Sequence, residues 1–168
     1  MAYYDTIALG YNELHSEEQL RKLRIIANEL KPKHGQWLLD VGCGTGLSGS
    51  VFSKFGCEIV GVEPSKELAK LAKFKVFNAK AEALPLQSGT FDYVVCVTAL
   101  HNFENPEKGL KEMKRVAKPN AKLAITVLKK SPKADALRLL ITKTFKISRE
   151  IEEAKDVIFV CKAKGGLK

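Results

Sequence analysis

Short apolar runs alternate with segments of helical periodicity along most of this chain, and this alternation constrains its fold more than any other feature. Two late runs, at residues 145–151 and 157–161, follow each other closely and predict a closing antiparallel hairpin. The whole pattern predicts an α/β fold with a doubly wound, mostly parallel, Rossmann-like sheet of seven strands and helices on both faces. The other strand candidates are residues 37–41, 58–62, 74–77, 91–97 and 123–128.

Helix-capping residues stand between these runs. Ser16 followed by Gln19 has the spacing of a capping box, which predicts a helix that begins after Ser16 and ends before Pro32. Similar signals recur later, at Ser65 for a helix through Lys73, at Asn105-Pro106 and at Ser131-Pro132.

The chain has 168 residues, which suits one domain, and neither a repeat nor a linker divides it. We therefore expect residues 1–168 to form a single domain. No stretch approaches the roughly 20 apolar residues of a membrane-spanning helix, so we expect no membrane partner. The N-terminal sequence MAYYDTIALG lacks the basic and apolar regions of a secretory signal, which favours a cytoplasmic protein.

Charge is distributed unevenly along the chain. The formal net charge is +9, and residues 1–100 hold 11 basic and 11 acidic residues, so the whole excess lies in residues 101–168. A basic segment of this kind is typical of proteins that bind an anionic partner such as RNA. A lysine-rich solvated surface is the favoured interpretation, since only five of the 28 basic residues are arginine. Both interpretations stay open at this point.

The four cysteines, at positions 43, 57, 96 and 161, lie far apart and form no C-x-x-C motif. This spacing does not suit a zinc site, so we expect no metal. Buried, reduced thiols are the expected state in a cytoplasmic protein.

A glycine-rich loop follows the first predicted strand, with the sequence Asp40-Val41-Gly42-Cys43-Gly44-Thr45-Gly46. Closely spaced glycines let a backbone turn tightly and approach a ligand without Cβ clashes. Ligands of doubly wound sheets bind at this end of the strands. The segment from Gly44 to Gly49 fits the dinucleotide fingerprint only formally, because Gly44 lies two residues beyond the first glycine of the loop.

An acidic residue, Glu63, directly follows the second predicted strand. A carboxylate at this place can accept hydrogen bonds from the ribose hydroxyls of an adenosine-containing cofactor. Dehydrogenases and methyltransferases share this feature, so Glu63 predicts adenosine without deciding the reaction.

Five stretches resemble one known family when they are taken together. The chain is similar to the class I S-adenosylmethionine (SAM)-dependent methyltransferases, especially the UbiE-like, or type 11, group. The resemblance implies SAM as cofactor, S-adenosylhomocysteine as product, and methyl transfer to an oxygen, nitrogen or carbon atom of an acceptor. The stretches are LLDVGCGTG at 38–46, GVEPS at 61–65, AEALPL at 81–86, FDYVVCVTALHNF at 91–103 and LKEMKRVAKPNAKLAI at 110–125.

The same resemblance implies roles for single residues. The glycine loop would hold the methionine end of SAM, Glu63 the ribose, and Ala81 with Glu82 the adenine. His101 would flank the reacting methyl group and is the first candidate for a catalytic base, with Tyr11 as the second. Residues 1–35 would form a helical lid over a core of residues 36–168. The expected cofactor-binding residues are Tyr4, Tyr11, Asp40, Gly42, Cys43, Gly44, Gly46, Glu63, Pro64, Ser65, Ala81, Glu82, Thr98 and His101.

One departure from the family pattern affects the adenine site. Lys80 stands where the family often has an aspartate that binds the adenine amino group, and lysine cannot accept that hydrogen bond. Adenine then needs Glu82, backbone groups or water.

The acceptor is open from the sequence. A small molecule is slightly favoured because it is common in the UbiE-like group, with RNA or protein as alternatives that involve the basic segment or a partner subunit. A non-catalytic SAM-binding subunit and a nicotinamide dehydrogenase are the other two classes considered.

Overall fold

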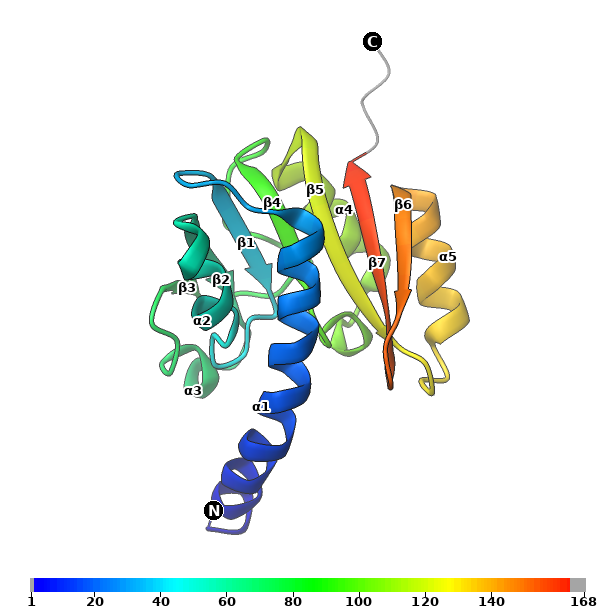
Figure 1. Cartoon of the computed structure of the whole chain (residues 1–168). Coiled ribbons are helices and arrows are strands. Elements are labelled where there is room, and N and C mark those ends of the chain that lie inside the picture. The colour runs from blue at the N-terminus through cyan, green and yellow to red at the C-terminus, as the bar shows by residue number, and fades with distance from the viewer. Residues whose placement is uncertain (1, 164–168) are drawn as a thin grey trace.

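Seven strands form one mixed sheet in the computed structural model, which describes residues 2–163 and, for side chains, residues 16–163. The sheet order is β3-β2-β1-β4-β5-β7-β6. The strands β1 to β5 run parallel, and β7 lies antiparallel between β5 and β6 (Figure 1). The predicted fold class, including the closing hairpin, is confirmed. The strands are β1 Trp37–Val41, β2 Glu58–Val62, β3 Lys75–Phe77, β4 Phe91–Cys96, β5 Ala117–Leu128, β6 Phe145–Glu152 and β7 Asp156–Ala163.

Helices cover both faces of this sheet. α1 and α2 lie on one face, and α4 and α5 lie on the other (Figure 1). None of the helices in the described part of the chain is long and apolar enough to cross a membrane. The helices are α1 Ala2–Leu30, α2 Ser48–Phe52, α3 Lys66–Ala69, α4 Pro106–Val116 and α5 Ala134–Thr144, with short 3₁₀ turns η1 Ser53–Phe55 and η2 Leu100–Asn102.

The sheet separates two layers of hydrophobic core. Ile26 and Leu30 of α1 are 0% exposed on one face, as are Leu110 of α4 and Ile141 of α5 on the other. Burial of each such side chain stabilises the fold by about 1.5–3 kcal/mol. The four cysteines are free and buried, as expected. Residues 16–30 of α1 therefore belong to the packed body of the fold.

Two predicted helix caps are confirmed. The backbone N–H three residues further on donates to Ser65 Oγ (3.3 Å) and to Asn105 Oδ1 (3.1 Å). Pro106 then occupies the first turn of α4, where its missing N–H costs no hydrogen bond. Both caps work through contacts within one turn of helix, which explains why the local sequence predicts them.

The predicted start of the first helix is wrong. Ser16 lies inside α1, which begins at Ala2 and continues through it. An N-cap residue needs non-helical backbone, whereas the residues before Ser16 are helical themselves.

Three other predicted bounds shift by a few residues. α3 ends at Ala69 rather than at Lys73, and α5 begins at Ala134 rather than directly after Ser131-Pro132. β5 begins at Ala117 rather than at residue 123, because ladder pairing with β4 starts where α4 ends.

Leu137 and Leu139 lie two positions apart on α5 and are 2% and 71% exposed. Leu137→Ala removes packed methyl groups and is expected to lower the free energy of unfolding by about 2–5 kcal/mol. Leu139→Ala is the matched control and should change it by less than about 0.5 kcal/mol. Urea unfolding followed by circular dichroism measures both values. Equal effects would contradict the assigned faces of α5.

Candidate functional site

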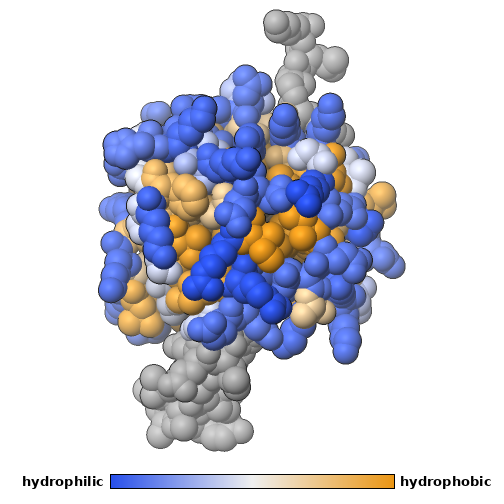
Figure 2. Space-filling view, viewed as in Figure 1, coloured by the Kyte–Doolittle hydropathy of each residue, from blue (hydrophilic) through white to orange (hydrophobic). Residues whose placement is uncertain are grey.

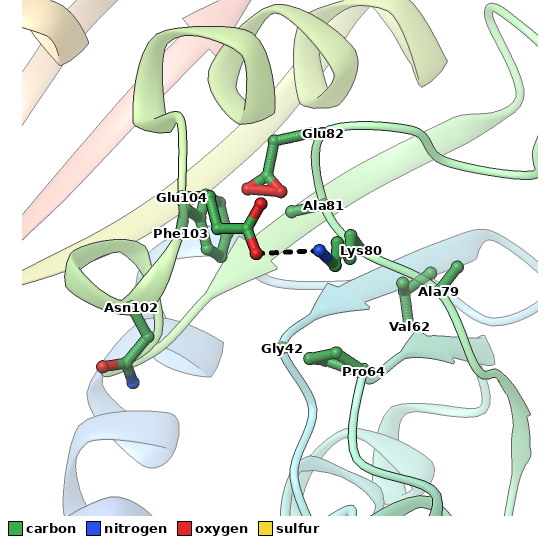
Figure 3. Close-up of a pocket in the computed structure, with 10 residues that line it drawn as sticks. All are labelled: Gly42, Val62, Pro64, Ala79, Lys80, Ala81, Glu82, Asn102, Phe103 and Glu104. Atoms are coloured by element: carbon green, nitrogen blue, oxygen red, sulfur yellow. Dashed lines mark hydrogen bonds and ion pairs between the residues drawn. The ribbon is translucent and has the colours of Figure 1, made fainter.

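The order of the strands reverses between β1 and β4, so the chain leaves these neighbours in opposite directions and opens a crevice at their carboxyl ends. A pocket of about 140 Å³ lies there. Its walls come from residues that follow β1, β2, β3 and β4 (Figure 3). The topology thus brings four separate segments of the chain together at one place.

The glycine loop after β1 turns through left-handed backbone at Gly42, Gly44 and Gly46, with φ of 73°, 53° and 83°. A Cβ on Gly42 would lie 2.5 Å from the Cβ of Ala99, and one on Gly46 would lie 3.0 Å from the Cα of Ala72. Packing therefore requires glycine at both positions. A Cβ on Gly44 would meet nothing within 4 Å, so the space beside Gly44 is open.

Glu63 follows β2 and is almost fully buried. Its Oε1 accepts a hydrogen bond from the Gly44 N–H (3.0 Å), and its Oε2 accepts one from the Ser65 N–H (2.8 Å). The side chain of Asn78 holds the segment in place by donating to the carbonyl oxygens of Glu63 and Pro64. Glu63 therefore links the glycine loop to the end of β2.

Asp40 is the last but one residue of β1 and is buried beneath the glycine loop. Burial, together with the nearby charge of Glu63, raises the pKa of Asp40 from 3.8 to about 6. The Ser48 hydroxyl donates to Asp40 Oδ2 (2.5 Å), which opposes that rise. The carboxyl group is thus poised to titrate just below neutral pH.

An ion pair spans the pocket on the side of β3 and β4. Lys80 Nζ lies 2.8 Å from Glu104 Oε1, and both side chains are largely exposed. Figure 3 shows Lys80 and Glu104 reaching toward each other, with Glu82 directed into the same region. Glu82 Oε1 is buried and has no hydrogen-bond partner among the described residues. A buried acceptor in this state is costly unless a donor reaches it.

The residues after β4 turn sharply at Thr98, which has φ of 52° although it is not glycine. His101 follows in η2, and its backbone oxygen accepts a hydrogen bond from Lys133 Nζ (3.2 Å). Desolvation lowers the pKa of the half-buried His101 imidazole. The charge of Asp156 raises this pKa, whereas the charges of Lys133 and Lys22 lower it further. The neutral imidazole, which can accept a proton, is favoured.

The expected site residues fall into three groups. Gly42, Pro64, Ala81 and Glu82 line the pocket. Tyr4 and Tyr11 lie outside the residues whose side chains are described. The rest lie around the pocket without lining it: Asp40, Cys43, Gly44, Gly46, Glu63 and Ser65 on the side of β1 and β2, and Thr98 and His101 after β4.

Sequence reasoning missed part of the pocket wall. Asn102, Phe103 and Glu104 line it and were not expected, whereas Lys80, which the family pattern had already singled out, lines it too. Phe103 and Asn102 stand inside a stretch that resembles the family, which was a usable signal. Nothing in the sequence pairs Lys80 with Glu104, because the two residues are 24 positions apart.

The pKa of Asp40 generates a testable pH dependence. The folded protein holds the Asp40 proton more tightly than the unfolded chain, so Asp40 favours folding at low pH and loses this contribution between pH 3.8 and about 6. Asp40→Asn cannot titrate but can still accept from Ser48. The stability of Asp40→Asn relative to wild type should therefore increase over this pH range and level off above it. Urea unfolding at several pH values measures the difference, and a difference independent of pH would contradict the raised pKa.

Comparison with known proteins gives a family. Residues 39–125, more than half of the chain, match the family described as methyltransferase domain. A demethylmenaquinone methyltransferase of Renibacterium salmoninarum is 32% identical over 133 residues, which cover 74% of this chain and 56% of that protein. The chain spans 50% to 62% of the length of the first curated relatives it matches.

Solved structures share the fold. A SAM-dependent methyltransferase from Aquifex aeolicus has a TM-score of 0.73 at 23% identity, covering 84% of this chain and 89% of that chain. A chain of the complex between a methyltransferase activator and a methyltransferase from Haloferax volcanii has a TM-score of 0.81 at 13% identity, covering 96% and 97%. The family match over residues 39–125, together with the Renibacterium relative, establishes that the chain belongs to the class I SAM-dependent methyltransferases, in the UbiE-like group.

Proposed function

We propose that this protein transfers a methyl group from SAM to a small-molecule acceptor. The observation that carries the proposal is the pocket at the reversal point of the sheet, where open space beside Gly44, the carboxylate of Glu63 and the unpartnered Glu82 Oε1 lie around one crevice. Each of these features suits one part of SAM.

Glu63 suits the ribose. Each of its carboxylate oxygens accepts one backbone N–H and keeps a second lone pair for another donor. Two neighbouring hydroxyl groups can use these lone pairs, so the loop contacts orient the carboxylate without saturating it. The space beside Gly44 would take the methionine end, because no Cβ occupies it.

Glu82 suits the adenine. The adenine amino group can donate two hydrogen bonds, and Glu82 Oε1 is a buried acceptor that has no donor among the described residues. This contact would replace the aspartate that the family often has at position 80. The Lys80–Glu104 ion pair would then cover the ring from the solvent side.

SAM supplies a methyl group that its sulfonium already activates, so the chain has to align the acceptor and exclude water. An oxygen or nitrogen acceptor also needs a base for its proton. His101 is the candidate, since the lowered pKa keeps its imidazole neutral. Tyr11 is kept as a second candidate, carried by the part of the expected lid that precedes Ser16, since residues 16–30 pack on the sheet.

The choice of a small molecule has two supports. The Renibacterium relative is named for methylation of demethylmenaquinone, a small molecule. The second support is that the surface does not concentrate charge in one place. On the face that carries α1, hydrophilic side chains are dispersed, with hydrophobic areas between them (Figure 2). Much of the basic charge is locally neutralised, by ion pairs that involve Lys111, Arg115, Lys118, Lys129, Arg138, Arg149 and Lys155.

RNA is the second candidate acceptor, favoured by the excess of basic over acidic residues in positions 101–168. A SAM-binding subunit that needs a partner is the third. It is supported by the Haloferax chain, whose structure was solved as a complex with a methyltransferase activator.

Glu63→Ala removes the proposed ribose acceptor and should weaken binding of S-adenosylhomocysteine by about 1–3 kcal/mol. Glu67→Ala, on the exposed side of the neighbouring α3, is the matched control and should bind like wild type. Isothermal titration calorimetry measures both affinities. Equal affinity of Glu63→Ala and wild type would remove the ribose role.

The acceptor is identified by transfer of a labelled methyl group from SAM into fractionated cell extract. We expect label in the small-molecule fraction. Label in nuclease-sensitive material would replace our proposal by an RNA methyltransferase. No label, together with normal binding of S-adenosylhomocysteine, would favour the subunit that needs a partner.

A further inference from the structure

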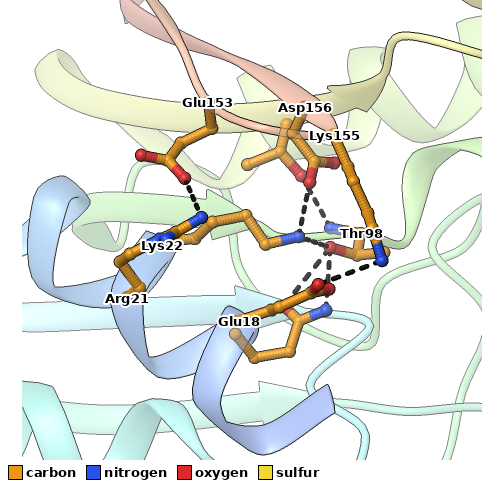
Figure 4. A network of polar contacts seen from close by, with 9 residues as sticks. Glu18, Arg21, Lys22, Thr98, Glu153, Lys155 and Asp156 are labelled. Carbon is orange, nitrogen blue, oxygen red and sulfur yellow. Dashed lines mark hydrogen bonds and ion pairs between the residues drawn. The ribbon is translucent and has the colours of Figure 1, made fainter. Parts of the chain in front are cut away.

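A buried ion pair ties α1 to the far end of the chain. Lys22 Nζ of α1 lies 2.8 Å from Asp156 Oδ2 at the start of β7, and both side chains are about 5% exposed. Lys22 Nζ also donates to Thr98 Oγ1 at 2.6 Å. Figure 4 shows Lys22 reaching between Asp156 and Thr98. Gln19, one turn earlier on α1, donates to the same Oγ1 at 3.1 Å. The ammonium group is therefore shared between a carboxylate and the hydroxyl that follows β4.

Thr98 is the strained point of this network. Left-handed backbone is unfavourable for a β-branched residue, because its Cβ crowds the neighbouring carbonyl oxygen. Such a conformation persists only where the surroundings enforce it. Here the Thr98 N–H donates to Thr126 Oγ1 (2.8 Å), while Lys22 and Gln19 hold the hydroxyl.

The turn at Thr98 directs the next residues toward the pocket. Ala99 packs closely on Gly42: a Cβ built on Gly42 would lie 2.5 Å from the Cβ of Ala99. The Asn102 N–H then donates to the Ala99 oxygen (2.9 Å), which closes η2. Phe103 and Glu104 follow as part of the pocket wall. The direction of this wall thus depends on one backbone conformation.

We propose that Lys22, fixed by Asp156, is a positioning residue for the cofactor site: it holds Thr98 in its left-handed conformation and thereby sets the wall from Ala99 to Glu104. The inference rests on the proposed SAM site and adds to it a residue of α1 that does not line the pocket. A neighbouring surface ion pair, Arg21–Glu153 (2.8 Å), joins α1 to the β6–β7 turn without touching Thr98.

That surface pair provides the matched control. Lys22→Met should weaken binding of S-adenosylhomocysteine by about tenfold, the factor expected for relaxation of one strained left-handed residue. Arg21→Met removes an ion pair from the same turn of α1 and should bind within about twofold of wild type. Lys22→Met alone leaves the Asp156 carboxylate buried without its partner, so the double variant Lys22→Met/Asp156→Leu is tested as well. Calorimetry is run at a temperature where all variants are folded.

Rescue separates positioning from stability. Glycine adopts left-handed backbone without a Cβ clash, so Thr98→Gly combined with Lys22→Met should recover most of the lost affinity without recovering the melting temperature. Loss of affinity in proportion to loss of stability, with no rescue, would overturn the proposal. Normal affinity in Lys22→Met/Asp156→Leu would overturn it as well.

A second readout needs no ligand. Backbone NMR shifts of Thr98 and residues 99–104 should change in Lys22→Met and stay close to wild type in Arg21→Met. Unchanged shifts would reject the positioning role even if wild type failed to bind S-adenosylhomocysteine. Failure of wild type to bind S-adenosylhomocysteine would itself reject the proposed function. The NMR shifts therefore test the positioning role, and the binding measurement tests the proposed function.

Discussion

The close approach of Gly42 and Ala99 is the contact on which the site depends. These residues follow neighbouring parallel strands, β1 and β4, from which the chain departs in opposite directions. A side chain at position 42 would force the two exits apart, because its Cβ would overlap the Cβ of Ala99. With glycine there, the loop after β1 and the segment after β4 meet, and the pocket forms beside their junction.

Features set by a few adjacent residues could be predicted from the sequence. The strands, the glycine loop, and the caps at Ser65 and Asn105 are of this kind. The predicted cap at Ser16 was wrong. The spacing of Ser16 and Gln19 is compatible with a cap, but the residues before Ser16 are already helical. The Lys22–Asp156 pair joins residues 134 positions apart, so only the assembled sheet reveals it. The pairing of Lys80 with Glu104 has the same origin.

The charge of the site differs in sign from the charge of the whole protein. The formal net charge is +9, yet Asp40, Glu63, Glu82 and Glu104 gather around the crevice with Lys80 as the basic residue among its lining. An acidic crevice attracts a cation, and the sulfonium of SAM is one. In the proposed cofactor site, the same carboxylates would hold the product S-adenosylhomocysteine less strongly, because it has lost that positive charge. Electrostatics would then favour exchange of product for fresh SAM.

The place of β7 in the sheet has a consequence for the order of folding during synthesis. Among the described residues, β7 is the last strand in sequence, yet it lies between β5 and β6 and supplies the pairing partner of both. The ribosome delivers β6 first, and β6 has no strand to join until residues 156–163 have emerged. Until then, one edge of β5 stays open, and Lys22 has no Asp156 to meet. The sheet can therefore close only after residues 156–163 have been translated, and until then the growing chain carries an unpaired β5 edge that a chaperone has reason to shield.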